Sequence, residues 1–290
     1  MLSGRITTRP MFKYVTLDRI DILVNQEIRY TQLGAFNDPF EMPVFVEKLF
    51  EKNTLGSDFE KNFPKLIRDK YAKIPIVVRI KLPFKVFEEE VKKRSHTLIP
   101  QFNHFLEAKM PEFRKTIQNT DKFFGVLSLT KTCDNLLMWS HYSGQHTGMV
   151  IDFDEFHSIF DERKSPKDFI RHLQQVIYSD TRPVLKTLED FSYADYMLMK
   201  STEWSYEKEW RIAKTVADAK RTIPASPYDI CLFDMPATAI KRVILGARVS
   251  SEDVDRIRNI IRSIPHLRHI RLQQASLDER RFALNFSDCE

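Results

Sequence analysis

The chain has 290 residues, of which 42% are hydrophobic, and a formal net charge of +5. This length and composition suit a folded chain with a substantial buried core, and they exclude an intrinsically disordered one. No apolar run approaches the roughly 18 residues of a membrane span, and residues 1–10 lack the apolar core of a signal peptide, so we expect a cytoplasmic protein without a membrane partner.

Glycine is scarce, with 7 residues in the chain. Phosphate-binding loops need clustered glycines, because their backbone turns tightly and passes close to the phosphates. The glycines here form neither a GxGxxG nor a Walker A motif, which argues against a Rossmann dehydrogenase, a P-loop ATPase and a protein kinase. The three cysteines lie far apart, which predicts reduced thiols rather than a disulfide framework or a zinc motif.

Hydrophobic periodicity predicts strands and helices in an irregular order along the chain. We expect strands at 12–15, 28–31, 124–129, 147–153, 176–178, 207–212, 229–233, 240–245 and 270–272. We expect helices at 17–24, 134–144, 155–175, 184–202 and 251–263. A charged helical pattern covers 46–122, which we interpret as an insertion within a single α+β domain over 1–290. The irregular order favours a split, mostly antiparallel sheet with flanking helices over a regular parallel α/β fold.

The strongest candidate for a functional site surrounds Glu207 and Glu209, at the start of a predicted strand. Side chains two residues apart on a strand point to the same face, so the two carboxylates are expected to converge. Like charges so close raise each other's pKa, and the pair therefore needs a positive partner or a substrate. One interpretation is a solvated Glu-x-Glu-x-Arg ladder that includes Arg211. The other is a carboxylate site for a substrate that develops positive charge.

Four blocks of sequence resemble the bacterial family known as domain of unknown function 2971. They are Phe12-Lys13-Tyr14 with Ile28-Arg29-Tyr30, Phe36-Asn37-Asp38-Pro39-Phe40-Glu41, Met138-Trp139-Ser140-His141-Tyr142 with His146-Thr147-Gly148, and Trp204-Ser205-Tyr206-Glu207-Lys208-Glu209-Trp210-Arg211. The resemblance spans most of the chain. It implies little about function, because the family brings little established function.

The layout is also similar to that of ADP-ribosyltransferases, in which a first strand carries His or Arg, a later strand carries Ser or Tyr, and a last strand begins with the catalytic Glu. Here Lys13-Tyr14-Val15-Thr16 takes the first place, Ser128 the second, and Glu207-Lys208-Glu209 the last. The chain departs from the family at the first strand, where Lys13 or Tyr14 replaces the His or Arg that contacts NAD.

This second resemblance implies an enzyme that cleaves NAD and modifies a macromolecule, either protein or nucleic acid. The setting would be a toxin or a phage-defence effector with a neutralising or defence partner protein. Glu209 would stabilise the oxocarbenium-like ribose, and Glu207 would orient or deprotonate the acceptor. Tyr142 or Tyr30 would stack on nicotinamide, and Arg29 would hold the pyrophosphate. The full implied set of NAD contacts is Tyr14, Arg29, Tyr30, Ser128, Trp139, Tyr142 and Arg211.

The segment 241–272 supports an alternative, non-catalytic module that binds nucleic acid or senses phage, and it is also a route to a nucleic-acid acceptor. Its basic residues are Lys241, Arg242, Arg248, Arg256, Arg258, Arg262, Arg268 and Arg271, against Glu252, Asp253 and Asp255. The simpler interpretation of this segment is the solvated face of a helix.

Other polar groupings give weaker predictions, and a nuclease or another hydrolase stays open. The set His141, His146, Asp152 and Asp154 matches no zinc spacing, so we predict no metal. Cys133 with His141 or His146 lacks an oxyanion hole and the signature of a thiol protease. Asn37 and Asp38 with Glu41 are typical of a capped turn, and Asn37 or Asp38 becomes a polar anchor if the turn folds over the glutamate pair.

Overall fold

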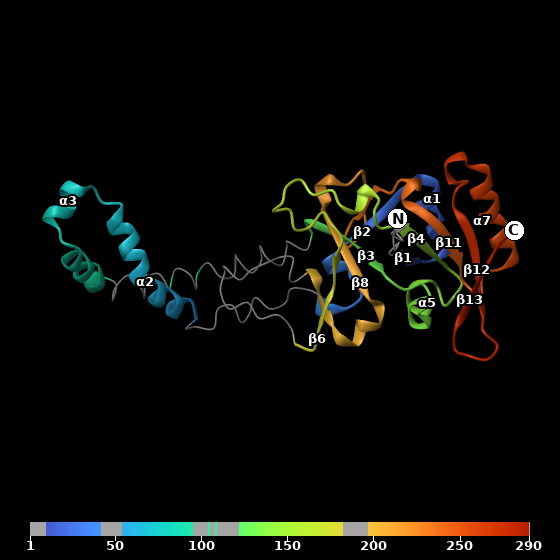
Figure 1. Ribbon diagram of the computed structural model, residues 1–290, viewed down its shortest axis with the longest axis horizontal. Coiled ribbons are helices and arrows are strands. Elements are labelled where there is room, and N and C mark those ends of the chain that lie inside the picture. Colours follow the sequence, from blue (N-terminus) through green and yellow to red (C-terminus); the bar gives the residue numbers. More distant parts are fainter. Residues whose placement is uncertain are drawn as a thin grey trace, which may run out of the picture. The chain divides into compact units, whose positions relative to one another are not determined.

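The computed structural model describes residues 10–41, 54–94, 104, 108, 122–181 and 197–289 (Figure 1). The chain divides into a core unit, formed by Met1–Met42, Asp121–Arg182 and Ala194–Glu290, and a second unit, formed by Pro43–Thr120 and Pro183–Tyr193. The second unit contains helices α2 (Thr54–Ala72) and α3 (Ile76–Lys81) and a helix over 84–94. Most of the rest of the predicted insertion at 46–122 lies outside the described residues, and the single domain over 1–290 stays a prediction.

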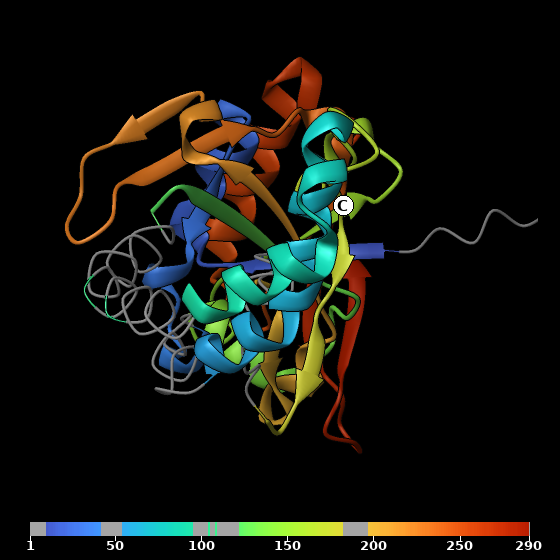
Figure 2. The same ribbon diagram turned by 90° about the vertical axis from the view of Figure 1, so that its left-hand side faces the viewer.

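In the described part of the core unit, eleven strands form one open sheet in the order β13-β12-β11-β4-β1-β3-β2-β10-β9, with β8 on β3 and β5 on β8. They are β1 (Pro10–Val15), β2 (Glu27–Gln32), β3 (Phe124–Thr130), β4 (Met149–Asp154), β5 (Gln174–Gln175), β8 (Glu209–Thr215), β9 (Arg221–Ile223), β10 (Ile230–Asp234), β11 (Ile240–Leu245), β12 (Arg271–Leu277) and β13 (Leu284–Asp288). The β11–β12 pair is parallel, and the other pairs are antiparallel. Hairpins β12–β13, in red, and β9–β10, in orange, lie at the two ends of this strand order (Figure 2), and β5 is the edge strand of the β8 branch.

The sheet splits beside β3, and this split positions the candidate site. One edge of β3 pairs with β8 along its whole length, from Phe124↔Thr215 to Thr130↔Glu209. The other edge pairs with β2 at Gly125 and Val126 and with β1 at Thr130. β1 instead follows β4 along its whole length. Residues 127–129 of β3 therefore face a gap where β1 and β2 diverge.

Three of the described α-helices pack against the sheet of the core unit, namely α1 (Asp21–Asn25), α5 (Leu136–Tyr142) and α7 (Ser251–Ser263). Side-chain caps begin two of them, α5 and α7. Asn135 Oδ1 accepts the backbone N–H of Met138 at the start of α5, and Ser250 Oγ accepts that of Asp253 at the start of α7. α7 lies along β11 and β12 (Figure 1) and buries Val254, Ile257 and Ile261, whose spacing places them on one helix face.

The structure confirms the α+β class and the mostly antiparallel sheet. The helix predicted at 155–175 is wrong: 3₁₀-helix η5 (Ser158–Phe160) is followed by turns and β5. Asp168 accepts the backbone N–H groups of Lys164, Ile170 and Arg171, so its side chain stabilises a turn instead of a helix.

The helix predicted at 184–202 is wrong at its end. Residues 182–196 lie outside the described residues, and the chain then forms β7 (Met199–Ser201), which pairs in parallel with β6 (Ile177–Ser179). A 3₁₀-helix, η6 (Thr202–Glu207), leads from β7 to β8.

Candidate functional site

A pocket of about 330 Å³ opens at the split between β1, β2 and β3. It is smaller than most drug-binding cavities but large enough for a nucleoside-sized group. Seven of the sequence-predicted site residues line it, namely Tyr14, Arg29, Ser128, Tyr142, Glu207, Glu209 and Arg211. The split therefore brings together side chains from β1, β2, β3, α5, η6 and β8.

The two glutamates reach the pocket by a route that the sequence analysis did not anticipate. η6 ends at Glu207, Lys208 adopts a left-handed conformation with φ 45° and ψ 49°, and β8 begins only at Glu209. The prediction that both side chains share one strand face is therefore wrong for Glu207. Hydrogen bonds fix the junction: Thr130 Oγ1 donates to the Glu207 carbonyl at 2.5 Å, and the Glu209 N–H donates to the Tyr178 hydroxyl at 2.8 Å.

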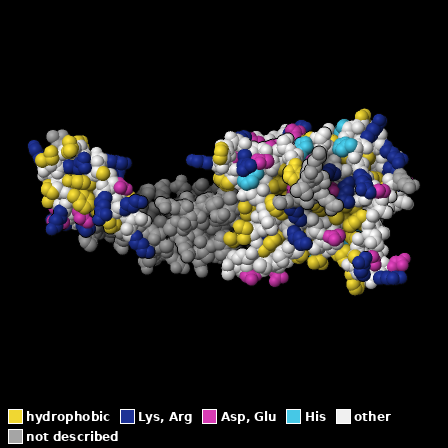
Figure 3. All heavy atoms as spheres, in the orientation of Figure 1, with side chains coloured by type: hydrophobic (Ala, Val, Ile, Leu, Met, Phe, Trp, Pro, Cys, Tyr) yellow, Lys and Arg dark blue, Asp and Glu magenta, His cyan; other side chains and the backbone are white. Residues whose placement is uncertain are grey.

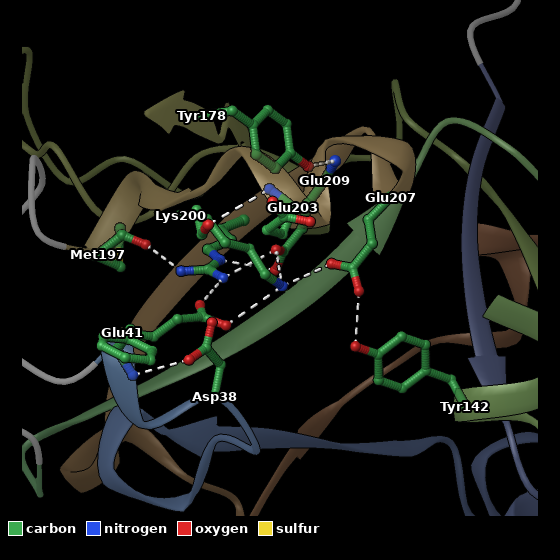
Figure 4. Close-up of polar contacts among 12 residues, drawn as sticks. Asp38, Glu41, Tyr142, Tyr178, Met197, Lys200, Glu203, Glu207 and Glu209 are labelled. Carbon is green, nitrogen blue, oxygen red and sulfur yellow. Dashed lines mark hydrogen bonds and ion pairs between the residues drawn. The ribbon is translucent and has the colours of Figure 1, made fainter. Parts of the chain in front are cut away.

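Five residues form a buried charge cluster, which consists of Glu41, Lys200, Glu207, Glu209 and Arg211 (Figure 4). Lys200 Nζ lies 2.6 Å from Glu207 Oε2, 3.0 Å from Glu209 Oε2 and 3.3 Å from Glu41 Oε1. Arg211 Nε donates to Glu209 Oε1 at 2.7 Å, and Arg211 Nη2 also contacts Glu41. Each of the five side chains is at most 5% exposed, so the solvated-ladder interpretation is wrong.

Arg211 is a positioning residue. Its Nη1 donates to the Met197 carbonyl at 2.6 Å, its Nε and Nη2 both donate to Glu209, and the side chain is 1% exposed. Because each guanidinium nitrogen already donates to the protein, the group holds Glu209 and Glu41 in place, although the sequence analysis named Arg211 among the NAD contacts.

Sequence reasoning missed Lys200 and underused Glu41. Lys200 lies in a segment that the sequence analysis assigned to a helix. The one sequence feature that points to a buried lysine there is its position directly after the apolar run Met197-Leu198-Met199. Glu41 was assigned to the turn at Asn37-Asp38-Pro39, and it does follow such a turn, since Asp38 Oδ1 accepts the Phe40 N–H at 2.8 Å. The polar-anchor alternative concerned Asn37 or Asp38, whereas it is the Glu41 carboxylate that contacts both cations of the cluster.

The cluster sets the protonation of its members. Burial alone would raise the pKa of Glu209, but the charge and hydrogen bonds of Arg211, followed by Lys200, lower that pKa to about 2. Burial raises the pKa of Glu41, and the positive charges of Arg211 and Lys200 oppose this increase. Burial and the adjacent Glu207 raise the pKa of Tyr142, whose hydroxyl donates to Glu207 Oε1 at 2.7 Å. At neutral pH, Glu209 is therefore a carboxylate, and Tyr142 is a neutral donor.

The pocket is basic on the side of β1 and β2. Lys13 Nζ crosses the gap and donates to the Ser128 carbonyl at 3.1 Å, which replaces a ladder hydrogen bond missing at 127–129. The Ser128 side chain hydrogen-bonds Glu209. Arg29 lines the same pocket, and its buried Nε has no hydrogen-bond partner among the described residues. Two basic side chains thus share a pocket with Glu207 and Glu209.

Two predicted NAD contacts lie in the core and away from the pocket. Tyr30 is fully buried and packs on Phe233 with ring centroids 4.5 Å apart. Trp139 is fully buried, stacks on His146, and contacts the Tyr14 ring edge-on at 5.4 Å. Both side chains stabilise the fold, so neither can stack on a ligand in this pocket without rearrangement.

The weaker constellations do not form sites among the described residues. No group of three or more His, Cys, Asp or Glu side chains there is placed to hold a metal. Asp152 pairs with Arg242 at 2.6 Å instead. Burial raises the pKa of Cys133 to about 11, which disfavours the thiolate that nucleophilic catalysis needs.

Four of the eight basic residues in the segment 241–272 form ion pairs with acidic side chains. The pairs are Arg242–Asp152, Arg256–Asp253, Arg258–Asp255 and Arg271–Asp288. On the face shown in Figure 3, basic and acidic side chains of the core unit stand beside one another. This pairing lowers the positive potential that a phosphate backbone would meet.

None of the described helices is both long enough and apolar enough to cross a membrane.

The model of one known family, described as a protein of unknown function (DUF2971), matches residues 138–212. The matched segment runs from α5 to the first half of β8, and it contains Tyr142, Lys200, Glu207, Glu209 and Arg211. No curated protein and no solved structure matches the chain. Over residues 138–212 the chain is therefore similar to DUF2971, whose description assigns no activity.

Proposed function

We propose that this protein is an ADP-ribosyltransferase-like enzyme, which cleaves NAD in the pocket and modifies a macromolecular acceptor. The observation that carries the proposal is the meeting of the Glu207 and Glu209 carboxylates with Arg29 and Lys13 in one pocket of about 330 Å³. NAD needs both kinds of group, because its pyrophosphate is anionic and its ribose develops positive charge as nicotinamide leaves.

Glu209 is suited to stabilise the oxocarbenium-like ribose. Its pKa of about 2 keeps it ionised throughout the physiological range. The hydrogen bonds from Arg211 and Lys200 fix its direction, so that little reorganisation accompanies the reaction. The positive charges of Arg211 and Lys200 also offset part of the negative charge of Glu209. The proposal therefore assigns Glu209 the task of orienting and stabilising the ribose, with Arg211 in a positioning role.

Glu207 and Tyr142 are suited to handle the acceptor. Glu207 Oε2 accepts from Lys200 and its Oε1 accepts from the Tyr142 hydroxyl. An incoming hydroxyl or amine could replace the Tyr142 hydroxyl at Oε1 and pass its proton to the carboxylate. The Tyr142 and Tyr14 rings supply pocket walls for the flat nicotinamide.

Arg29 is suited to hold the pyrophosphate. Its unpartnered Nε would gain a charge-assisted hydrogen bond there. The pocket volume lies near the lower end of small-molecule sites, about 300–1,000 Å³. We therefore place nicotinamide and its ribose inside the pocket and the adenosine half at its mouth.

The test follows free nicotinamide and labelled ADP-ribose after incubation of the purified full chain with labelled NAD and a cell lysate. Glu209→Gln should abolish nicotinamide release, whereas Glu207→Gln should reduce transfer more than release. Glu203→Gln is the matched control, because Glu203 belongs to η6, as Glu207 does, but its side chain is exposed. Thermal unfolding of each variant separates loss of chemistry from loss of fold.

The alternative, a non-catalytic nucleic-acid-binding module, predicts a different pattern. No NAD binding and no turnover in any lysate fraction would refute the enzyme. The alternative would then require that charge reversal of Arg256, Arg258 and Arg262 removes nucleic-acid binding, with a steep salt dependence. A nuclease would instead lose activity on chelation of divalent ions.

A further inference from the structure

Two lysines line the pocket, and the fold holds them in opposite ways. Lys200 Nζ lies within 3.3 Å of three carboxylates. Burial alone would lower its pKa, but these carboxylates raise the pKa above the ordinary lysine value. Lys13 Nζ has the Ser128 carbonyl as its hydrogen-bond partner, and no carboxylate of the described residues lies within ion-pair distance of it.

The surroundings of Lys13 increase the fraction of its neutral form. Burial lowers the pKa of Lys13 to about 8. Of the charged groups that face it, Glu209 on β8 raises this pKa, while Arg19, before α1, and Arg29 on β2 lower it. A shift from 10.5 to about 8 increases the neutral fraction at pH 7 by roughly 300-fold. A neutral lysine amine in a pocket is the nucleophile that forms Schiff bases with carbonyl compounds.

We propose that Lys13 forms an imine with the C1 aldehyde of a ribose-phosphate ligand, of which ADP-ribose is the member that NAD cleavage would produce. The identity of this ligand rests on the proposed function. In the ring-opened sugar, Nζ adds to the aldehyde carbon. The carbonyl oxygen then leaves as water with both hydrogens of the amine, and a double bond joins C1 to Nζ. Water reverses the reaction and restores Lys13.

The neighbours of Lys13 fit this chemistry. Ser128 accepts from Lys13 through its carbonyl, and its side chain hydrogen-bonds Glu209, so a single residue separates the amine from an ionised carboxylate. That carboxylate would stabilise the positive charge of a protonated imine. Arg29, with its unpartnered Nε in the same pocket, is placed to hold the phosphate of the sugar.

Reductive trapping tests the proposal. The full chain is incubated with ADP-ribose and cyanoborohydride, and modified lysines are located by peptide mass spectrometry. We expect Lys13 to be modified at least 10-fold faster than the exposed Lys164, with a rate that rises to a plateau above about pH 8. Lys200 is the internal control: it lines the same pocket and should stay unmodified. ADP, which lacks the aldehyde, should give no adduct.

The Lys13→Arg variant keeps the positive charge and should lose the adduct without losing thermal stability. Modification of Lys13 at the rate of Lys164 would overturn the proposal. Nicotinamide release from NAD is measured on the same preparation with the cell lysate added, so the two proposals can fail separately. Release without trapping at Lys13 refutes the imine and leaves the enzyme. Trapping without release refutes NAD cleavage and leaves Lys13 as an imine-forming residue for ribose phosphates from another source.

Discussion

Lys200→Met should destabilise the core unit strongly. The Lys200 side chain is 4% exposed, and its Nζ is bonded to Glu207 and Glu209 and paired with Glu41. Removing this amine leaves three buried carboxyl groups with a single cationic partner, the Arg211 guanidinium. Breaking a buried ion pair by removing one partner costs about 3–5 kcal/mol, a large part of the roughly 5–15 kcal/mol that stabilises a typical domain. Urea unfolding of the wild type and the variant measures this difference.

The control for this prediction is Lys164→Met, which removes an exposed lysine 3.9 Å from Asp218 and should change stability by less than about 1 kcal/mol. A double variant adds Glu207→Gln to Lys200→Met. Because it removes one surplus carboxylate, it should recover about 1–3 kcal/mol relative to additive losses. A loss below about 1 kcal/mol in Lys200→Met, or strict additivity in the double variant, would refute the buried charge cluster.

Three further predictions concern pH, ligand binding and backbone packing. The folded-state pKa of Glu209 is about 2, below its ordinary 4.5. Ionised Glu209 therefore contributes roughly 3 kcal/mol to the free energy of unfolding above pH 4.5, and this contribution is lost as pH falls toward 2. Acid unfolding of the wild type and of Glu209→Gln measures the difference. Arg29→Gln should raise KM for NAD by roughly 10-fold or more, with unfolding unchanged, because it removes a charged donor to phosphate. Gly148→Ala should cost more than about 2 kcal/mol in urea unfolding, since a Cβ would lie 2.3 Å from the Val15 carbonyl and 2.7 Å from that of Ser143; a smaller loss would refute this close approach.

Most of the sheet could be predicted from the sequence because its strands carry local signals. β3 and β4 are short apolar runs bounded by turns, and both appear where expected. The failures occur where a side chain overrides the local pattern. The segment around Asp168 has helical spacing of apolar residues, yet the hydrogen bonds of that carboxylate make a turn more stable.

The candidate site was predictable only in part. The carboxylates were found because Glu-x-Glu places two charges close together in sequence. Their partners were not, because Glu41 lies 170 residues from Arg211 along the chain and local periodicity carries no information about such contacts. The conformation of Lys208 was missed for a related reason: a left-handed residue between two glutamates is fixed by tertiary hydrogen bonds to Thr130 and Tyr178 and not by its own propensity.

The composition of the buried charge cluster favours function over stability as the reason for its presence. Well-packed apolar side chains of similar volume are often as stabilising as a buried ion pair, or more so. The cluster also holds three carboxyl groups, Glu41, Glu207 and Glu209, against the two cations Lys200 and Arg211. These carboxyl groups line a pocket together with Lys13, whose pKa is lowered to about 8. The two proposals share one property: NAD cleavage and an iminium at Lys13 would each place developing positive charge next to these carboxylates.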